Sequence, residues 1–116
     1  MQSKISCQVR IMVGSGLGMG PGKAAMLRAI QETRSINAAG KKFGMSYRRA
    51  WLLVEEMNHL FEGPLVTARR GGAGGGGAEV TGLGERVLQS YAELEQLVTK
   101  SPQFRAISRM LQQRPD

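Results

Sequence analysis

Two predicted helices meet within residues 35–51, which read SINAAGKKFGMSYRRAW. Ser35 and Ser46 each stand directly before a run with helical periodicity, where a serine hydroxyl can accept a hydrogen bond from the first turn of a helix. Gly44 lies between the two runs and can adopt the left-handed conformation that ends a helix. The segment therefore predicts a helix that ends at Gly44, a tight turn, and a second helix over residues 47–61.

Apolar residues recur at helical spacing in both predicted helices. In the first, the inward stripe is Ile36, Ala39, Gly40 and Phe43. Its small members would let the backbone of another helix approach closely. In the second, the buried stripe is Ala50, Leu53, Val54, Met57, Leu60 and Phe61. Tyr47, Arg48 and Arg49 are left on the exposed first turn of the second helix.

A glycine run follows two adjacent arginines, Arg69 and Arg70. Residues 71–77 read GGAGGGG, so six of these seven positions are glycine. Such a run can be a disordered linker or the tip of a hairpin. Strand-like segments at residues 65–68 and 78–81 flank the run and favour a hairpin with a basic, glycine-rich tip.

The N-terminal part of the chain predicts a strand, a loop and a helix. Residues 4–13 alternate, with Ile5, Cys7, Val9, Ile11 and Val13 on one face, which is typical of a strand. Residues 14–22 are glycine-rich and are expected to form a loop before a helix over residues 23–34, with Lys23 as a solvated helix start. Leu17 and Ala24 break the spacing of a phosphate-binding Walker motif, so a nucleotide-binding enzyme is disfavoured.

A long helix is predicted over residues 83–99. Val87, Tyr91, Leu94 and Val98 follow one another at intervals of four, three and four residues, the spacing of a coiled-coil seam. A narrow apolar stripe on a terminal helix suits a partner subunit, so these four residues are the expected dimer interface. Ser101 and Pro102 then predict the start of a short closing helix.

Composition limits the classes of function. The 116 residues include 16 Lys and Arg against 9 Asp and Glu, a formal charge of +7, which favours a polyanionic partner. One Cys and one His exclude an internal disulfide framework and leave no set of ligands for structural zinc. With no apolar run long enough to span a bilayer and no signal peptide, we expect a cytoplasmic protein without a membrane partner, a metal or a cofactor.

Together these elements describe a mostly α, α+β fold, a winged helix-turn-helix. The major groove of B-DNA, about 12 Å wide, admits one helix, and an arginine on its first turn can contact guanine O6 and N7. Residues 1–20 would form the N-terminal strand and loop, residues 21–82 the DNA-binding domain, and residues 83–116 the dimerisation and closing helices. Trp51 is expected to pack within the protein rather than to stack on bases. The alternatives to the DNA-binding interpretation are solvated charge at Arg48 and Arg49, and a winged helix that binds another protein.

The same residues resemble the DNA-binding domain of the ModE family of molybdate-responsive transcriptional regulators. The resemblance rests on Ser35 through Gly44, Ser46-Tyr47 with Ala50-Trp51, Glu56-Met57-Asn58, and the glycine run followed by Thr81 and Gly84. It implies a winged helix akin to that of LysR-type regulators, a homodimer, a palindromic duplex operator and no catalytic activity. It also implies which residues face DNA: Ser35, Ser46, Tyr47, Arg48, Arg49, Arg69, Arg70 and Gly71.

Family members continue into molybdate-binding domains, whereas this sequence stops at Asp116. We therefore expect a single-domain form without a molybdate-sensing domain of its own. Such a form would act constitutively, sense molybdate through a separate molybdate-binding partner, or regulate something else.

Overall fold

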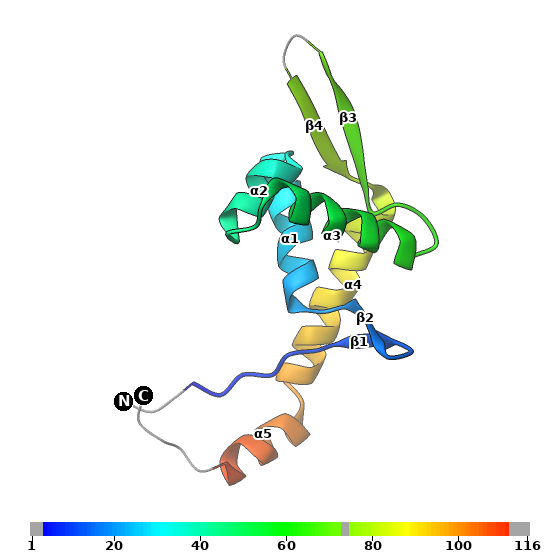
Figure 1. The fold of residues 1–116 in the computed structure, drawn as a ribbon. Helices are drawn as coiled ribbons and strands as arrows, with labels where there is room; N and C mark the ends of the chain where they lie inside the picture. Colours follow the sequence, from blue (N-terminus) through cyan, green and yellow to red (C-terminus); the bar gives the residue numbers. More distant parts are fainter. Residues whose placement is uncertain (1–3, 73–74, 112–116) are drawn as a thin grey trace.

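The computed structural model describes residues 4–72 and 75–111, an α+β chain with a winged-helix-like layout (Figure 1). Its elements in chain order are β1 (Ile11–Val13), β2 (Gly16–Met19), α1 (Pro21–Thr33), α2 (Ile36–Lys42), α3 (Tyr47–Leu60), β3 (Val66–Gly72), β4 (Gly75–Val80), α4 (Gly82–Thr99) and α5 (Pro102–Met110). The strands form two antiparallel hairpins, β1–β2 and β3–β4. This layout agrees with the fold class predicted from the sequence.

The helix-turn-helix forms as predicted. The Ser35 hydroxyl accepts a hydrogen bond from the Ala38 amide at 3.0 Å, and the Ser46 hydroxyl accepts one from the Arg49 amide at 3.1 Å. Gly44 has φ +69°, the left-handed region that glycine adopts without strain. A Cβ built on Gly40 would lie 2.7 Å from the Cβ of Ala50, so α2 and α3 approach as closely as the small residues suggested.

The core lies where α1, α3 and the start of β3 meet. The largest fully buried side chains are Met26, Leu27, Ile30, Met57 and Leu65. Two members of the predicted stripes are not buried: Phe43 is 47% exposed and Leu60 is 37% exposed. Phe43 was misplaced because α2 ends at Lys42 and the chain leaves the helical path there, whereas Leu60 is the last residue of α3 and lines a pocket rather than the core.

The N-terminal prediction was partly wrong. Ile5, Cys7 and Val9 are half-buried in alternation, but the strand covers only residues 11–13, and Ile11 and Val13 are exposed. Its partner is β2, within residues predicted as a loop. Gly14, with φ +61°, lies in the turn that reverses the chain, and a strand requires such a hydrogen-bonded partner as well as alternation.

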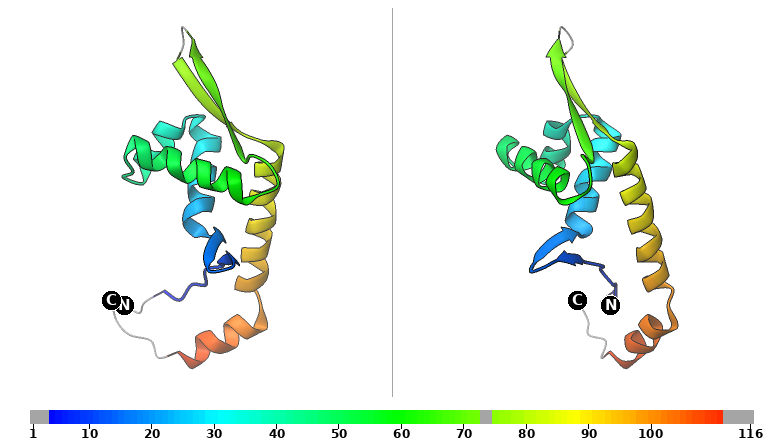
Figure 2. Two further views of the ribbon diagram at one scale, coloured as in Figure 1. Left: turned by 45° about the vertical axis from the view of Figure 1, so that its right-hand side comes forward. Right: turned by 90° about the vertical axis from the view of Figure 1, so that its right-hand side faces the viewer.

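The β3–β4 hairpin is the wing that the sequence predicted. Val66 pairs with Val80, Thr67 with Glu79, and Ala68 with Ala78 in an antiparallel register. The wing projects beyond α2 and α3 at one end of the molecule, whereas the β1–β2 hairpin lies toward the other end (Figures 1 and 2). The wing is therefore placed beside the helix-turn-helix.

Helix α4 descends from the root of the wing to α5 (Figure 2). Tyr91 on α4 is buried within the chain, and its hydroxyl donates a hydrogen bond to the Val9 carbonyl at 2.6 Å. Burial raises the pKa of this phenol, and the nearby carboxylate of Glu95 raises it further, so Tyr91 remains a donor. None of the helices in the described ranges has the length and apolar character needed to cross a membrane.

Candidate nucleic-acid interface

The first turn of α3 is an exposed cationic part of the helix-turn-helix. Tyr47 is 62% exposed, and Arg48 and Arg49 are exposed beside it. Among the residues that the structure describes, neither arginine forms an ion pair. Ser46 is exposed as well, but its hydroxyl already caps α3. The guanidinium groups of Arg48 and Arg49 are thus available to an anionic partner.

A groove separates the helix-turn-helix from the wing. Its volume is about 400 Å³, and its walls are formed by Ser35, Ile36, Asn37, Tyr47, Trp51, Arg69, Gly77 and Ala78. Three residues predicted to face DNA, namely Ser35, Tyr47 and Arg69, therefore meet at one place. The hydroxyl of Ser35 caps α2, so Ser35 mainly stabilises the backbone beside the groove.

Asn37 and Trp51 line the groove without having been predicted to face DNA. Asn37 is exposed on the first turn of α2. The ring of Trp51 lies 6.0 Å from that of Tyr47 between centroids, tilted by 53°, and stays partly exposed. Trp51 thus packs on a neighbouring ring and also lines the groove. The i, i+4 spacing of Tyr47 and Trp51 was the signal in the sequence that could have found this aromatic pair.

Arg69 lies on the wing and forms an ion pair with Glu79 of the neighbouring strand. Both side chains remain about half exposed, so solvent screens the attraction between them. Arg70 and Gly71 belong to β3, and the side chain of Arg70 lies outside what the structure describes. Of the predicted wing residues, Arg69 is therefore the one whose side chain can be placed beside the groove.

Charge is distributed unevenly along α3 and its flanks. Arg48 and Arg49 occupy the start of the helix, whereas Glu55 and Glu56 occupy its second half. Lys41 and Lys42 at the end of α2 add positive charge on the side of the helix start, although Lys42 pairs with Glu32 at 3.1 Å. Positively charged side chains are therefore concentrated at the end of α3 that borders the groove.

Lys23 does not start a solvated helix, contrary to the prediction. Its side chain is only 7% exposed, and its ammonium group donates hydrogen bonds to the Leu17 carbonyl at 2.6 Å and to Glu56 at 3.2 Å. The reason is that β2 folds back over the start of α1 and supplies the carbonyl of Leu17, while α3 supplies the carboxylate of Glu56. Lys23 thus links the first hairpin to the acidic half of α3.

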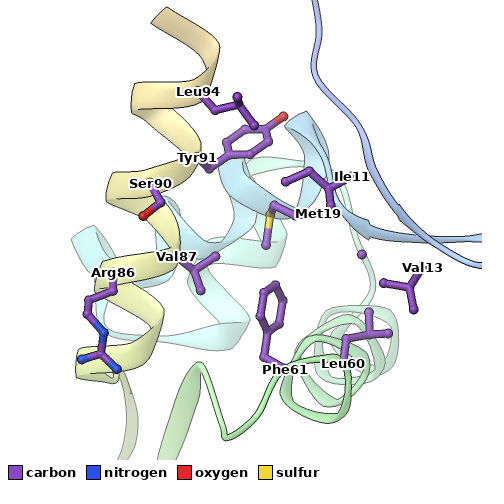
Figure 3. A pocket seen from close by; sticks show the side chains of 11 residues that line it. Ile11, Val13, Met19, Leu60, Phe61, Arg86, Val87, Ser90, Tyr91 and Leu94 are labelled. Atoms are coloured by element: carbon purple, nitrogen blue, oxygen red, sulfur yellow. The ribbon is translucent and has the colours of Figure 1, made fainter. Parts of the chain in front are cut away.

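Three of the four predicted dimer residues line an apolar pocket of about 310 Å³, and Val98 lies outside it. Val87, Tyr91 and Leu94 on α4 face Ile11, Met19 and Phe61 across it (Figure 3). Val87, Leu94 and Val98 are half-buried, and only Tyr91 is fully inside the chain. A second subunit could therefore reach Val87 and Leu94 but would meet little of Tyr91.

No family model matches the chain. It is 42% identical over 90 residues to the molybdenum-pterin-binding protein MopB of Rhodobacter capsulatus, a match that covers 78% of this chain and 33% of MopB. It is 43% identical over 81 residues to the transcriptional regulator ModE of Yersinia pestis, and 41% identical over 81 residues to the DNA-binding transcriptional dual regulator ModE of Escherichia coli K12. These matches cover 70% of this chain and 31% of each regulator. The chain thus spans about a third of the length of these relatives.

Proposed function

Because the chain carries a ModE-type domain, we propose that it is a sequence-specific DNA-binding transcriptional regulator rather than an enzyme. The exposed pair Arg48 and Arg49 carries this proposal, since it stands on the first turn of a capped helix beside a basic wing. We further propose that the protein binds as a homodimer to a palindromic operator, and that its target genes are connected with molybdenum. Recovery of bound fragments across a genome tests this, because the fragments would lie near molybdenum transport or cofactor genes.

The proposed mechanism places the start of α3 in the major groove. A helix that enters end-on presents its first turn to the base edges, where an arginine can donate two hydrogen bonds to one guanine. The groove between α3 and the wing would then follow the sugar-phosphate backbone, with Arg69 on the wing side and Asn37 and Tyr47 on the helix side. Phosphate contacts would set the register of the protein, and the arginines of α3 would read the bases.

Replacing Arg48 with alanine is expected to weaken binding to a cognate duplex by about 1–3 kcal/mol, with a much smaller loss on random duplex. The reason is that a guanine contact is made only on the correct sequence. Fluorescence anisotropy with both duplexes measures the difference. Arg109→Ala is the matched control, because it removes the same charge from α5 at the far end of the molecule. Equal weakening of both duplexes would make Arg48 a phosphate contact.

Replacing Leu94 with lysine is expected to convert the dimer to monomers, because a charged side chain would be forced into the apolar pocket at the proposed subunit contact. Sedimentation velocity measures the mass, and circular dichroism checks that the helices remain. Leu97→Lys is the control, since Leu97 on the same helix is 71% exposed. An unchanged mass for Leu94→Lys would place the subunit contact elsewhere.

In the proposed dimer, the two half-sites of the operator would lie about one helical turn of DNA apart.

A further inference from the structure

Asn58 joins α3, the recognition helix proposed to contact the base edges, to the wing. It lies two residues before the end of α3, and its side chain is half-buried. Its Oδ1 accepts hydrogen bonds from the backbone amides of Leu65 at 2.8 Å and Val66 at 3.1 Å. Its Nδ2 donates to the carbonyl of Val66 at 2.9 Å. One side chain on α3 thus satisfies three backbone groups where the first strand of the wing begins.

These bonds replace those that a neighbouring strand would make. Along an antiparallel hairpin, every second residue directs its N–H and C=O away from the partner strand. Water or another strand normally forms hydrogen bonds with these outward-facing groups. At Val66 both groups bond to the amide of Asn58. The outer edge of β3 is therefore attached to α3 at its first residue, and the direction in which the wing leaves the body is tied to the direction of the helix.

The root of the wing is buried, whereas its outer part is exposed. Leu65 and Val66 are buried, while Thr67, Ala68 and Arg69 are exposed. Three further hydrogen bonds hold the wing near its root: the Thr81 amide donates to the Leu65 carbonyl at 2.9 Å, the Thr81 hydroxyl donates to the Pro64 carbonyl at 2.7 Å, and the Ala78 amide donates to the Arg34 carbonyl at 2.9 Å. None of these bonds reaches α3. Asn58 thus supplies a direct hydrogen-bonded link between the wing root and the recognition helix.

We propose that Asn58 is a positioning residue for DNA recognition: it sets the wing at the angle to α3 at which Arg69 and the arginines of α3 contact one duplex together. This inference rests on the proposed DNA-binding function. Asn58 itself touches no DNA, since it lies at the opposite end of α3 from Arg48 and acts through Arg69. Its loss would leave the arginines of α3 in place but would release the wing, so that the contact of Arg69 with the duplex would be lost unless the wing were ordered at a cost in free energy.

A double-mutant cycle with Asn58→Ala and Arg69→Ala tests the proposal. Asn58→Ala is expected to weaken binding to a cognate duplex about tenfold and to lower the salt slope by about one, as if the Arg69 contact were lost. In the Arg69→Ala background, Asn58→Ala is expected to weaken binding by less than about twofold, because the contact that it positions is already absent.

Val54→Ala is the matched control, since Val54 is buried on the same helix one turn earlier. It should lower the midpoint of urea unfolding yet leave the salt slope unchanged. Asn58→Asp is a second variant, which retains the oxygen that accepts from Leu65 and Val66 and so should fold if Asn58→Ala does not. The repulsion between its added charge and the phosphates is the same in both backgrounds and cancels from the cycle, in which loss of the Nδ2 donor should couple to Arg69 in the same sense.

The outcomes separate the inference from the function on which it rests. Additive losses in the cycle, or an unchanged salt slope for a folded Asn58 variant, would make Asn58 a purely structural residue and overturn the inference. In that case salt-dependent binding by the unaltered protein would still support the proposed function. Failure of the unaltered protein to bind any duplex would overturn the proposed function, and the inference with it.

Discussion

Raising the salt concentration from about 50 to about 200 mM is expected to weaken binding of duplex DNA about a hundredfold. Each neutralised phosphate releases condensed counterions, and the slope of log K against log salt is about −0.9 per contact. Arg48, Arg49 and Arg69 are exposed around the groove, and Lys41 is exposed at the end of α2. About four contacts correspond to a slope of about −3.6. The slope for a dimer, which would present two helix-turn-helix units, would be steeper still.

Anisotropy titrations of a labelled duplex at four or five salt concentrations measure this slope. Circular dichroism and sedimentation at the same concentrations provide the control, because they report whether salt alters the fold or the oligomeric state. A random duplex should share most of the slope, since phosphate contacts carry no sequence information. A flat profile would argue against DNA as the polyanionic partner and would favour a winged helix that binds another protein.

Replacing Gly84 with alanine is expected to lower the free energy of unfolding by about 2–4 kcal/mol. A Cβ at this position would lie 2.5 Å from the carbonyl oxygen of Leu65 and 2.7 Å from Cγ1 of Val80. The Leu65 carbonyl cannot simply move aside, because it accepts the hydrogen bond from Thr81 that holds the root of the wing. Alanine favours a helix over glycine by about 1 kcal/mol, which offsets only part of this clash.

Urea unfolding followed by circular dichroism measures the change for Gly84→Ala. Gly22→Ala is the matched control, because Gly22 also lies in the first turn of a helix, α1, and a Cβ there would meet nothing within 4 Å. That substitution should leave stability unchanged or raise it by about 0.5–1 kcal/mol. Equal gains for both variants would show that α4 does not pack against the wing root as closely as described.

Features set by neighbouring residues could be predicted from the sequence. The caps at Ser35 and Ser46, the left-handed Gly44 and the pairing of the two segments around the glycine run depend on groups a few residues apart. For the same reason, the exposure of Tyr47, Arg48 and Arg49 followed from the face of α3 opposite its apolar stripe. The part of the candidate site on the first turn of α3 could therefore be predicted without a structure.

Features that join distant segments could not be predicted in this way. Lys23 was expected in solvent because its charge is costly to bury, yet Leu17 and Glu56 supply the partners that make burial tolerable. The strand at Ile11 was assigned too many residues because alternation alone does not show where a hydrogen-bonded partner is available. Tyr91 was placed on a subunit seam, whereas its hydroxyl finds an acceptor 82 residues away in Val9.

Local patterns along the chain were enough to predict the order of the helices, the hairpin around the glycine run and the cationic end of α3, because capping, helical period and turn chemistry act over short distances. Packing in three dimensions was needed to place the groove between Tyr47 and Arg69, to attach α3 to the root of the wing through Asn58, and to require that Gly84 remain without a side chain. These three features depend on how helices and strands pack in space, which local patterns leave undetermined.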